Sequence, residues 1–216
     1  MTPQAALEQG LDALALTLPA EACAKLLDYL ALMRKWNRTY NLTAIRDPLT
    51  MVTHHLLDSL ATVPHLGAAD ATLRVADVGS GAGLPGIPLA LARPAWHVTL
   101  NERSGKKAAF LRQAQIELSL PNVDVHEGDV ARWQPRQRFD CVITRAFAAL
   151  EDFVMRCRHL LAPGGVLAAM KGARPDAAPP GALPRDIRCT DVRRLRVPLL
   201  DAERHLVLCR VAEATA

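Results

Sequence analysis

The stretch VADVGSGAGLPGIPLA, residues 75–90, decides how this chain is expected to fold. It begins as an apolar strand with an acid, Asp77, near its end, and it continues into a helix that Pro85 can open. Between them lie four glycines within eight residues, which allow a tight turn and a close approach of the backbone to a ligand. These glycines are Gly79, Gly81, Gly83 and Gly86.

The glycine spacing matches the fingerprint of dinucleotide-binding folds, in which a Gly-rich turn links the first strand to a helix. An acid at Glu102, 21 residues after Gly81, lies near the position expected for a ribose-binding carboxylate. The fingerprint alone is weak evidence for the ligand, because a tight strand–helix turn has the same composition. The flanking elements and charges therefore have to discriminate between ligands.

Apolar strands and amphipathic helices alternate after the glycines. This alternation predicts an α/β fold with a parallel sheet covered on both faces. After a Pro-rich loop at 173–186, residues 191–198 and 203–213 form two more expected strands, too close for a helical crossover, so at least one should be antiparallel. The expected strands before the loop are 73–79, 95–102, 123–129, 139–147 and 166–172, and the expected helices are 85–92, 105–120 and 150–165.

The first seventy residues have a mostly helical pattern. Residues 21–41 carry apolar side chains at helical spacing, and Pro48 can open a further helix with Asp47 as its cap. We therefore expect an N-terminal helical extension, 1–70, and an α/β domain, 71–216, that together make one structural unit.

Composition bounds the class of protein. With 216 residues, half of them apolar and 22% charged, the chain can build a substantial packed core. Its five cysteines form no CxxC pair, and their odd number and wide spacing argue against a disulfide framework or a zinc site and fit a reducing cytosol. The N-terminus has no basic leader, and no apolar run reaches membrane-spanning length. We expect a soluble cytoplasmic protein with no bound metal.

The charge of the chain is uneven. Residues 1–70 carry five Lys and Arg against seven Asp and Glu, whereas residues 130–216 carry fifteen against nine. Such an excess is typical of a protein with a polyanionic partner. A solvated basic face explains it equally well at a net charge of only +4, so composition leaves both interpretations open.

Three acids favour a ligand without phosphate. Asp77, Glu102 and Asp129 stand at or just after the ends of three successive expected strands, and in a doubly wound sheet these ends line one crevice. Three carboxylates there would repel the pyrophosphate of a nicotinamide dinucleotide, the alternative ligand. They suit S-adenosylmethionine, which carries a sulfonium, an ammonium and a ribose diol. The sequence therefore favours a methyl-donor site.

Each acid has an expected role in that site. Asp77 can organise the methionine end of the donor, Glu102 can accept from both ribose hydroxyls, and Asp129 can face the adenine. The helix start at Leu84-Pro85 is expected to offer free backbone amides to the donor carboxylate. Asp77 and Asp129 also have a structural alternative as helix or turn caps, since aspartate is a common capping residue.

The methyl acceptor is indicated mainly by what the sequence lacks. The fourth strand runs into ITRAFAAL (143–150) rather than into the Asn/Asp-Pro-Pro-aromatic motif typical of amino-group methylation. Methylation of pyrimidine C5 needs a cysteine nucleophile, but Cys141 lies mid-strand, where a core role is expected. A site without a base or nucleophile suits a ring nitrogen such as guanine N7. Arg145 is placed to hold donor or acceptor, with pairing to Glu151 as the alternative.

Several motifs together resemble the RsmG family, also called GidB, over nearly the whole chain. They are KWNRTYNLTAIRDP (35–48), HHLLDSL (54–60), DVGSGAGLPGIPLA (77–90), GKKAAFLRQ (105–113), TRAFA (144–148), MKG (170–172) and ERHLV (203–207). The resemblance implies a class I S-adenosylmethionine-dependent methyltransferase: a Rossmann-like, mostly parallel seven-stranded sheet with an antiparallel C-terminal strand, plus the helical extension. It implies methylation of guanine N7 in the decoding region of 16S ribosomal RNA, within the small subunit or its precursor, with S-adenosylhomocysteine as product.

The resemblance also implies which residues act. Relatives often have glutamate where this chain has Ala131, so a side-chain contact would be lost there. The implied donor contacts fall on Gly79, Leu84, Glu102, Val130, Ala131 and Arg145, beside Asp77, Gly81, Gly83 and Asp129 from the crevice argument. RNA or acceptor contacts are expected among Asn41, His55, Asp58, Lys106, Lys171, Arg204 and His205, with Arg145, Lys171 and His205 as positioning candidates. Asn41 as a helix C-cap and Asp58 as the buried partner of a neighbouring helix are the structural alternatives.

Two other functions remain open from the sequence. A methyltransferase acting on another RNA or on a small molecule would have the same donor crevice, and a non-catalytic RNA-binding protein would keep it only as a vestige. With an RNA substrate, the basic residues would contact phosphates, and the target base would have to leave its stack. Trp36 and Tyr40 are candidates for base stacking, although aromatic residues four apart on an apolar helix are commonly core. We expect a monomer.

Overall fold

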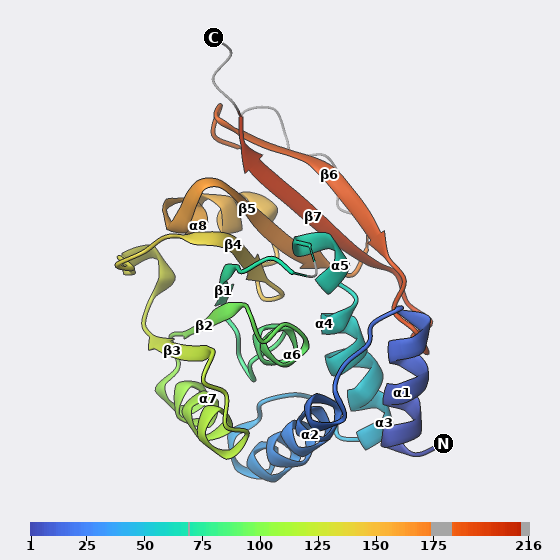
Figure 1. Ribbon diagram of the computed structural model, residues 1–216. Helices are drawn as coiled ribbons and strands as arrows, with labels where there is room; N and C mark the ends of the chain where they lie inside the picture. Colours follow the sequence, from blue (N-terminus) through green and yellow to red (C-terminus); the bar gives the residue numbers. More distant parts are fainter. Residues whose placement is uncertain (69, 174–182, 213–216) are drawn as a thin grey trace.

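A seven-stranded sheet forms the centre of the computed structural model, which describes residues 1–68, 70–173 and 183–212 (Figure 1). The strand order is β3-β2-β1-β4-β5-β7-β6, and β7 runs antiparallel to both of its neighbours, β5 and β6, while the other pairs of neighbouring strands in this sheet are parallel. The strands are β1 (Arg74–Val78), β2 (His97–Glu102), β3 (Val123–Glu127), β4 (Phe139–Thr144), β5 (Leu161–Lys171), β6 (Ile187–Leu195) and β7 (Arg204–Val211). The expected parallel sheet with an antiparallel C-terminal strand is confirmed.

The order reverses between β1 and β4, where the chain turns from building one half of the sheet to building the other. At such a switch point the loops after neighbouring strands diverge, which leaves a crevice at the carboxyl ends of the strands. The glycine stretch follows β1 directly, so the fold places it beside this crevice. Antiparallel β7 brings its first residues to the same edge, because Lys171 at the end of β5 pairs with His205.

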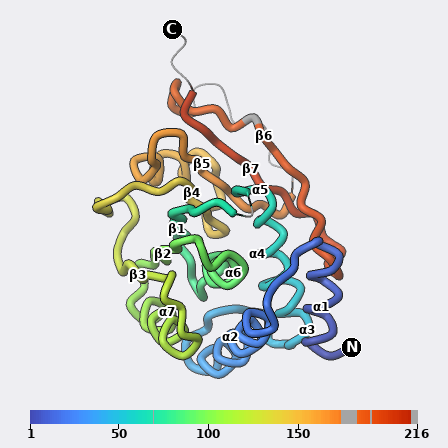
Figure 2. The backbone as a smooth tube through the Cα atoms, viewed as in Figure 1, coloured from blue at the N-terminus to red at the C-terminus, as the bar shows by residue number. Residues whose placement is uncertain are grey.

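Helices cover both faces of the sheet. The helices of the α/β part are α6 (Gly86–Ala92), α7 (Gly105–Glu117) and α8 (Leu150–Cys157), with short 3₁₀ turns η2 (Val130–Arg132) and η3 (Arg158–Leu160). The N-terminal part consists of α1 (Pro3–Ala13), α2 (Ala20–Tyr40), α3 (Pro48–Met51), the π-helical turn η1 (Val52–Leu57), α4 (Asp58–Leu60) and α5 (Val63–Leu66). Figure 2 shows these N-terminal helices grouped together, with α2 and α4 contacting α6.

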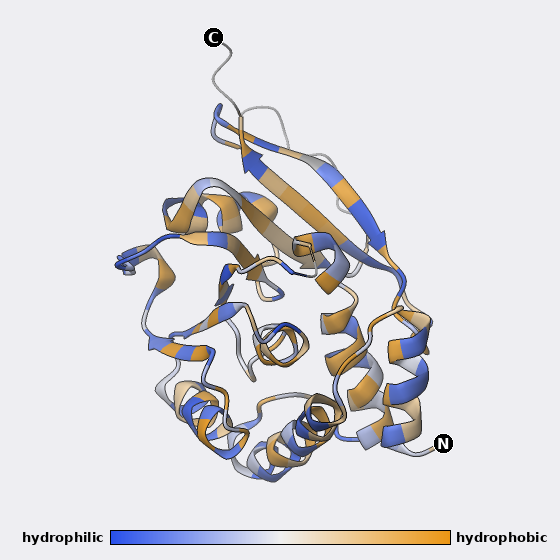
Figure 3. Cartoon of the chain, in the orientation of Figure 1, coloured by the Kyte–Doolittle hydropathy of each residue, from blue (hydrophilic) through white to orange (hydrophobic). Residues whose placement is uncertain are grey.

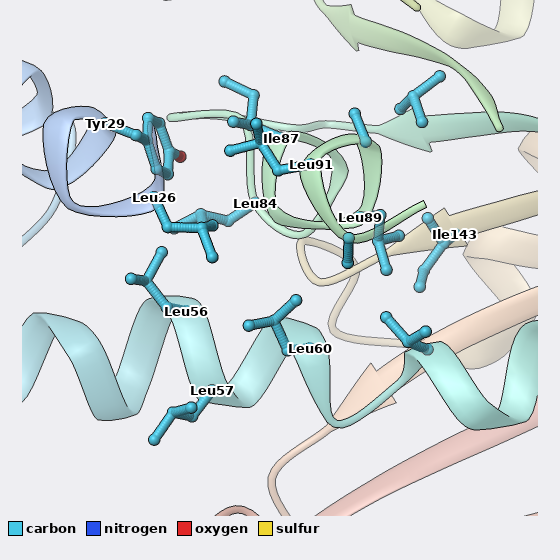
Figure 4. Close-up of a cluster of buried hydrophobic side chains, with 14 of the residues drawn as sticks. Leu26, Tyr29, Leu56, Leu57, Leu60, Leu84, Ile87, Leu89, Leu91 and Ile143 are labelled. Carbon is cyan, nitrogen blue, oxygen red and sulfur yellow. The ribbon is translucent and has the colours of Figure 1, made fainter. Parts of the chain in front are cut away.

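The N-terminal helices share a hydrophobic core with one face of the sheet. Leu26 and Tyr29 of α2 and Leu56 of η1 lie opposite Leu84 and Ile87, and all of these side chains are buried (Figure 4). A second core lies under α8 on the other face. β7 is largely apolar in Figure 3, which agrees with its burial between β5 and β6. Among the described residues, no helix has both the length and the apolar character needed to cross a membrane.

The prediction of a helix over 150–165 is correct for its first half and wrong for its second half. The helix ends at Cys157, and β5 begins at Leu161, which pairs with Phe139 of β4. The Pro-Gly-Gly sequence interrupts a strand rather than ending a helix: the register with β4 shifts there, and Gly164 has a φ of +76°. A β-bulge and a helix stop use the same residue types, so the sequence pattern does not separate them.

Other boundaries also differ from expectation. β4 ends at Thr144 rather than at 147, and β6 begins at Ile187, four residues before the strand expected at 191–198. The expected helix after Pro48 forms with Asp47 as its cap, whose carboxylate accepts from the Thr50 amide at 2.7 Å, but it widens into the π-helical turn η1. Helix ends and strand ends are the features least determined by local pattern.

One pair of cysteines is bonded, although the cysteine spacing gives no indication of a disulfide framework. Cys189 of β6 and Cys209 of β7 form a disulfide, with their Cα atoms 4.0 Å apart. Their 20-residue separation gave no hint of this pairing, because it is the β6–β7 hairpin that brings them together. Cys23, Cys141 and Cys157 are free, and the latter two are buried. The cysteine count therefore no longer supports a reducing compartment.

Candidate functional site

A cavity of about 340 Å³ opens at the carboxyl ends of β1, β2, β3 and β4, and we call it the donor cavity. It lies at the switch point of the sheet, where ligands of doubly wound folds bind. Several of its residues follow directly from strands, so the sheet fixes where their side chains point. The lining residues are Val78, Gly79, Asn101, Glu102, Arg103, Lys107, Gly128, Asp129, Val130, Ala146, Phe147 and Arg156.

Glu102 is the buried acid of the donor cavity. It ends β2, is 7% exposed, and accepts hydrogen bonds from the Gly81 amide (3.0 Å to Oε2) and the Ser104 amide (2.9 Å to Oε1). These bonds hold the carboxylate in one orientation, and each oxygen keeps a lone pair for a further donor. Glu102 can therefore accept from two hydroxyls of a ligand, as the sequence predicts.

Asp77 lies beneath the glycine loop and does not line the donor cavity. It is fully buried, and its Oδ2 accepts from the Gly86 amide at 2.8 Å, while Oδ1 has no partner among the described atoms. Burial raises its pKa to about 7, against the lowering effect of the Gly86 hydrogen bond and of Arg145. Its observed contact caps α6, and the unpartnered Oδ1 leaves one acceptor beneath the loop.

The prediction of free backbone amides at Leu84-Pro85 is wrong. The Gly83 and Leu84 amides both donate to the Ser80 carbonyl, at 2.8 and 3.0 Å, and the Gly86 amide is taken by Asp77. The loop folds back on itself before α6 begins, and this turn consumes the donors that a straight strand-to-helix connection would leave free. The glycines still matter: Gly79 has a φ of +67°, and a Cβ there would lie 3.0 Å from the Cβ of Ala146.

Asp129 lines the donor cavity and also caps the short turn η2. Its Oδ1 accepts from the Ala131 amide at 3.0 Å and from Arg156 at 2.8 Å. The Ala131 hydrogen bond and then that of Arg156 lower the pKa of the Asp129 carboxyl. Val130 lines the cavity, whereas exposed Ala131 does not.

Three cations of the donor cavity were missed by the sequence reasoning. Arg103 directly follows Glu102, Lys107 lies in the first turn of α7, and Arg156 comes from α8. The crevice therefore holds both signs of charge, and Arg156 neutralises Asp129. The electrostatic case against a pyrophosphate is weaker in the structure than in the sequence. Proximity to the end of β2 was a signal for Arg103 and Lys107, but nothing in the sequence pointed to Arg156.

A second cavity, of about 200 Å³, lies on the other side of the glycine loop. It shares Gly79 and Ala146 with the donor cavity, so two ligands bound in the two cavities would approach each other across these residues. We call it the acceptor-side cavity. It is lined by Leu42, Thr43, Gly79, Ser80, Gly81, Ala82, Leu84, Arg145 and Ala146.

Arg145 lies in the acceptor-side cavity and is tied to the N-terminal helices. Its Nη1 donates to the His54 carbonyl at 3.0 Å and to Asp58 Oδ2 at 3.3 Å, so the alternative of pairing with Glu151 is wrong. The His54 carbonyl is available because η1 is π-helical: the Asp58 amide donates to Thr53, five residues back, and to His55. The wide turn thereby supplies an acceptor for Arg145.

Comparison with known proteins decides the family. The GidB model, described as rRNA small subunit methyltransferase G, matches residues 22–207. The ribosomal RNA small subunit methyltransferase G of Burkholderia thailandensis is 52% identical over 217 residues, covering 99% of this chain and 94% of the relative. The same protein of Burkholderia pseudomallei is also 52% identical, covering 99% and 93%. The chain belongs to the GidB family.

Solved structures agree on the fold. A "predicted O-methyltransferase", protein Atu636 from Agrobacterium tumefaciens, has a TM-score of 0.55 at 26% identity, covering 74% of this chain and 81% of its own. A SAM-dependent methyltransferase from Aquifex aeolicus has a TM-score of 0.54 at 18% identity, covering 77% and 94%. GidB membership and this fold confirm the predictions of a class I methyltransferase fold and of an enzyme that uses S-adenosylmethionine.

Three candidates from the GidB motifs lie where β5 ends and β7 begins. Lys171 donates to the carbonyls of Phe147 and Ala148, both at 2.7 Å, and its burial lowers its pKa. Arg204 donates to Asp58 Oδ1 at 3.0 Å, and His205 is buried with Nδ1 3.4 Å from the Gly172 carbonyl. Lys171 and Arg204 thus support the loops around the acceptor-side cavity.

Asp58 is shared between two arginines, since it accepts from both Arg145 and Arg204. The interpretation of Asp58 as the partner of a neighbouring helix is therefore wrong: its partners follow β4 and begin β7. Its side chain is only 3% exposed. This carboxylate connects the N-terminal helices to two strands of the sheet.

The remaining GidB candidates lie apart from the donor cavity. His55 is buried with Nε2 3.0 Å from Thr43 Oγ1, and desolvation, aided by Arg145, lowers its pKa to about 4. Asn41 ends α2 in the left-handed conformation, with a φ of 49°, which matches the C-cap alternative. Lys106 is exposed on α7 and lines neither cavity, whereas its neighbour Lys107 lines the donor cavity.

Tyr29 of α2 donates a buried hydrogen bond to the Ala82 carbonyl in the glycine loop, at 2.6 Å. We expect Tyr29→Phe to lower the free energy of unfolding by about 1–2 kcal/mol, because a buried carbonyl loses its partner. Urea denaturation measures this loss. Tyr40→Phe is the control: Tyr40 is 39% exposed and has no hydrogen bond among the described residues, so its effect should stay within about 0.5 kcal/mol. Equal effects in both variants would show that the Tyr29 bond contributes nothing.

Proposed function

We propose that this chain transfers the methyl group of S-adenosylmethionine to N7 of a guanine in the decoding region of 16S ribosomal RNA. The observation that carries this proposal is the near full-length similarity to proteins named ribosomal RNA small subunit methyltransferase G. The two cavities joined at Gly79 and Ala146 support it, because a donor and an acceptor need adjacent sites.

The residues of the donor cavity fit S-adenosylmethionine. Glu102 is oriented by two backbone amides and retains lone pairs for the ribose hydroxyls. Asp77 lies outside the donor cavity and holds the Gly86 amide beneath the loop, and Gly79 leaves no Cβ where the donor would approach the backbone. Asp129 and Val130 lie where the adenine would end, with Ala131 offering only its backbone. Leu84, Gly81 and Arg145 line the neighbouring cavity, on the side of the methyl group, and Gly83 packs against Ile87 beneath it.

The chemistry needs alignment more than acid–base catalysis. When bound, the donor supplies a methyl group already activated by its sulfonium; the S–CH₃ bond breaks as the CH₃–N7 bond forms, and S-adenosylhomocysteine leaves. Guanine N7 has a free lone pair, so no proton has to be removed from it. Holding acceptor and methyl in line can lower the barrier by about 7–11 kcal/mol. Arg145, Lys171 and His205 are proposed to position the guanine.

The wider context of the reaction is also proposed. The substrate is 16S rRNA within the small ribosomal subunit or its precursor, the enzyme acts as a monomer in the cytoplasm, and residues 1–70 and 71–216 act as one unit. Asn41, Lys106, Lys171, Arg204 and His205 are the proposed RNA contacts. The expected RNA contact of His55 is not proposed again, because His55 is 3% exposed and lies against Thr43. The shared core of the N-terminal helices and the sheet supports a single unit.

The test is methyl transfer from labelled S-adenosylmethionine to small subunits from cells that lack this activity, followed by mapping of the labelled base. Label at N7 of one guanine in the decoding region is the expected result. Label at another atom or base would overturn the acceptor assignment and leave the donor site standing. If the donor binds but no RNA is labelled, a small-molecule acceptor or a non-catalytic role replaces the proposal.

A further inference from the structure

A basic pocket of about 320 Å³ lies on the N-terminal helical extension, outside both cavities of the proposed active site. Four of its six lining residues are cations, and no acid within residues 1–68, 70–173 and 183–212 lines it. We call it the α2 pocket. It is lined by Ala31, Arg34, Lys35, Asn37, Arg38 and Arg46.

The cations of the α2 pocket gather from two segments. Arg34 and Arg38 are one helical turn apart on α2, so they share a face with Lys35, and Arg46 comes from the loop after the helix. All four are exposed, and none of them forms an ion pair with a residue that the structure describes. The nearby carboxylate of Asp47 is already engaged by the amide and hydroxyl of Thr50, both at 2.7 Å. The cations thus remain available to an anionic ligand.

The loop that carries Arg46 is held against α2 by a two-way hydrogen bond. Asn37 donates to the Thr43 carbonyl at 2.9 Å and accepts from the Thr43 amide at 3.0 Å. Asn37 itself is 5% exposed, so this contact fixes the loop from inside. The backbone that carries Arg46 is therefore fixed relative to α2 before any ligand binds.

The same loop joins the α2 pocket to the acceptor-side cavity. Leu42 and Thr43 line that cavity, and Arg46, three residues later, lines the α2 pocket. A polyanionic chain lying on the pocket would therefore lead towards the place where the acceptor base is proposed to bind. Residues 1–70 carry fewer basic than acidic residues, so the charge count of this segment hides the cluster.

We propose that the α2 pocket binds the phosphate backbone of the substrate RNA beside the target nucleotide. This rests on the proposed function. Guanidinium groups bind phosphate oxygens in pairs of parallel hydrogen bonds, and such contacts fix the register of the nucleic acid without reading its bases. The pocket thereby supplies affinity for the RNA backbone next to the acceptor-side cavity.

The test compares methylation kinetics of the wild type with the triple variant Arg34→Gln, Arg38→Gln, Arg46→Gln. We expect KM for small subunits to rise about tenfold or more, with kcat and the Kd for S-adenosylmethionine unchanged, since phosphate contacts supply affinity and not chemistry. The slope of log KM against log salt concentration should fall by about two, because each lost phosphate contact removes about 0.7–0.9 from it.

A charge-matched control separates this pocket from overall charge. Arg138→Gln, Arg188→Gln and Arg210→Gln remove the same charge from exposed arginines at the opposite edge of the sheet, where β4 begins and β7 ends. This variant should keep the wild-type KM within about twofold if local phosphate contacts matter. An unchanged KM and salt slope in the α2 variant, or an equal rise in the control, would overturn the inference. Absence of methylation by the wild type would instead defeat the proposed function.

Discussion

Glu102→Ala is expected to raise the Kd for S-adenosylmethionine about 100-fold or more. The carboxylate has two backbone amides as partners and faces the donor cavity, so its removal deletes the acceptor for the ribose and also releases the glycine loop. Hydrogen bonds to a charged group contribute about 1.5–3 kcal/mol each, and two of them give a loss of about 3 kcal/mol or more. Isothermal titration calorimetry with S-adenosylmethionine measures this change.

Glu102→Gln serves as the matched control for size. Glutamine keeps one oxygen acceptor, but its amide group is a donor and would face the Gly81 or the Ser104 amide. We expect an intermediate Kd, with the free energy of unfolding closer to wild type than that of Glu102→Ala. Wild-type affinity in both variants would mean that the donor does not contact this carboxylate.

Asp58→Ala is expected to lower the free energy of unfolding by about 3 kcal/mol, because it leaves two guanidinium groups without their shared carboxylate. The Asp58 side chain is 3% exposed, whereas those of Arg145 and Arg204 are 31% and 23% exposed, so neither arginine can simply turn fully into water. Urea denaturation measures the loss. Methyl transfer should also fall, since Arg145 would no longer be held in the acceptor-side cavity.

Asp186→Ala provides the comparison for Asp58. Asp186 also pairs with an arginine, Arg158, at 3.1 Å, but that pair is exposed, with side chains 50% and 40% accessible. An exposed pair contributes about 0–1 kcal/mol, so this variant should fold and methylate almost as the wild type does. A similar loss of stability in both variants would contradict the view that burial makes the Asp58 contacts strong.

The order and type of most elements could be predicted from the sequence because their patterns are local. Apolar strands alternate with helices after residue 71, and the short final connection required an antiparallel strand, as β7 is. The bulge around Gly164 and Gly165 was misjudged because its residues also end helices. The disulfide between Cys189 and Cys209 was missed because strand pairing, not spacing, brings the two residues together.

The candidate site was predictable where it follows strand ends. Glu102, Asp129 and the glycines lie where the sheet places them, at or beside the donor cavity. Arg156 reaches the donor cavity from α8, and the two partners of Asp58 come from distant segments of the chain. Such contacts depend on how helices pack against the sheet, and this packing has no periodic signal in one sequence. The prediction of a free backbone amide at Leu84 is wrong for a related reason, since this amide donates to the Ser80 carbonyl within the same loop.

The π-helical turn η1 has a consequence for how this chain can change in length. A π-helical turn holds about one residue more than an α-helical turn, so it behaves as a one-residue insertion absorbed within a helix. Removing one residue from Val52–Leu57 would close the turn and rotate the preceding helix by about 100° relative to Asp58. It would also return the carbonyl that now accepts from Arg145 to the hydrogen-bond ladder of the helix. The number of residues in this turn, more than the identity of any one side chain, sets where the two arginines meet their carboxylate.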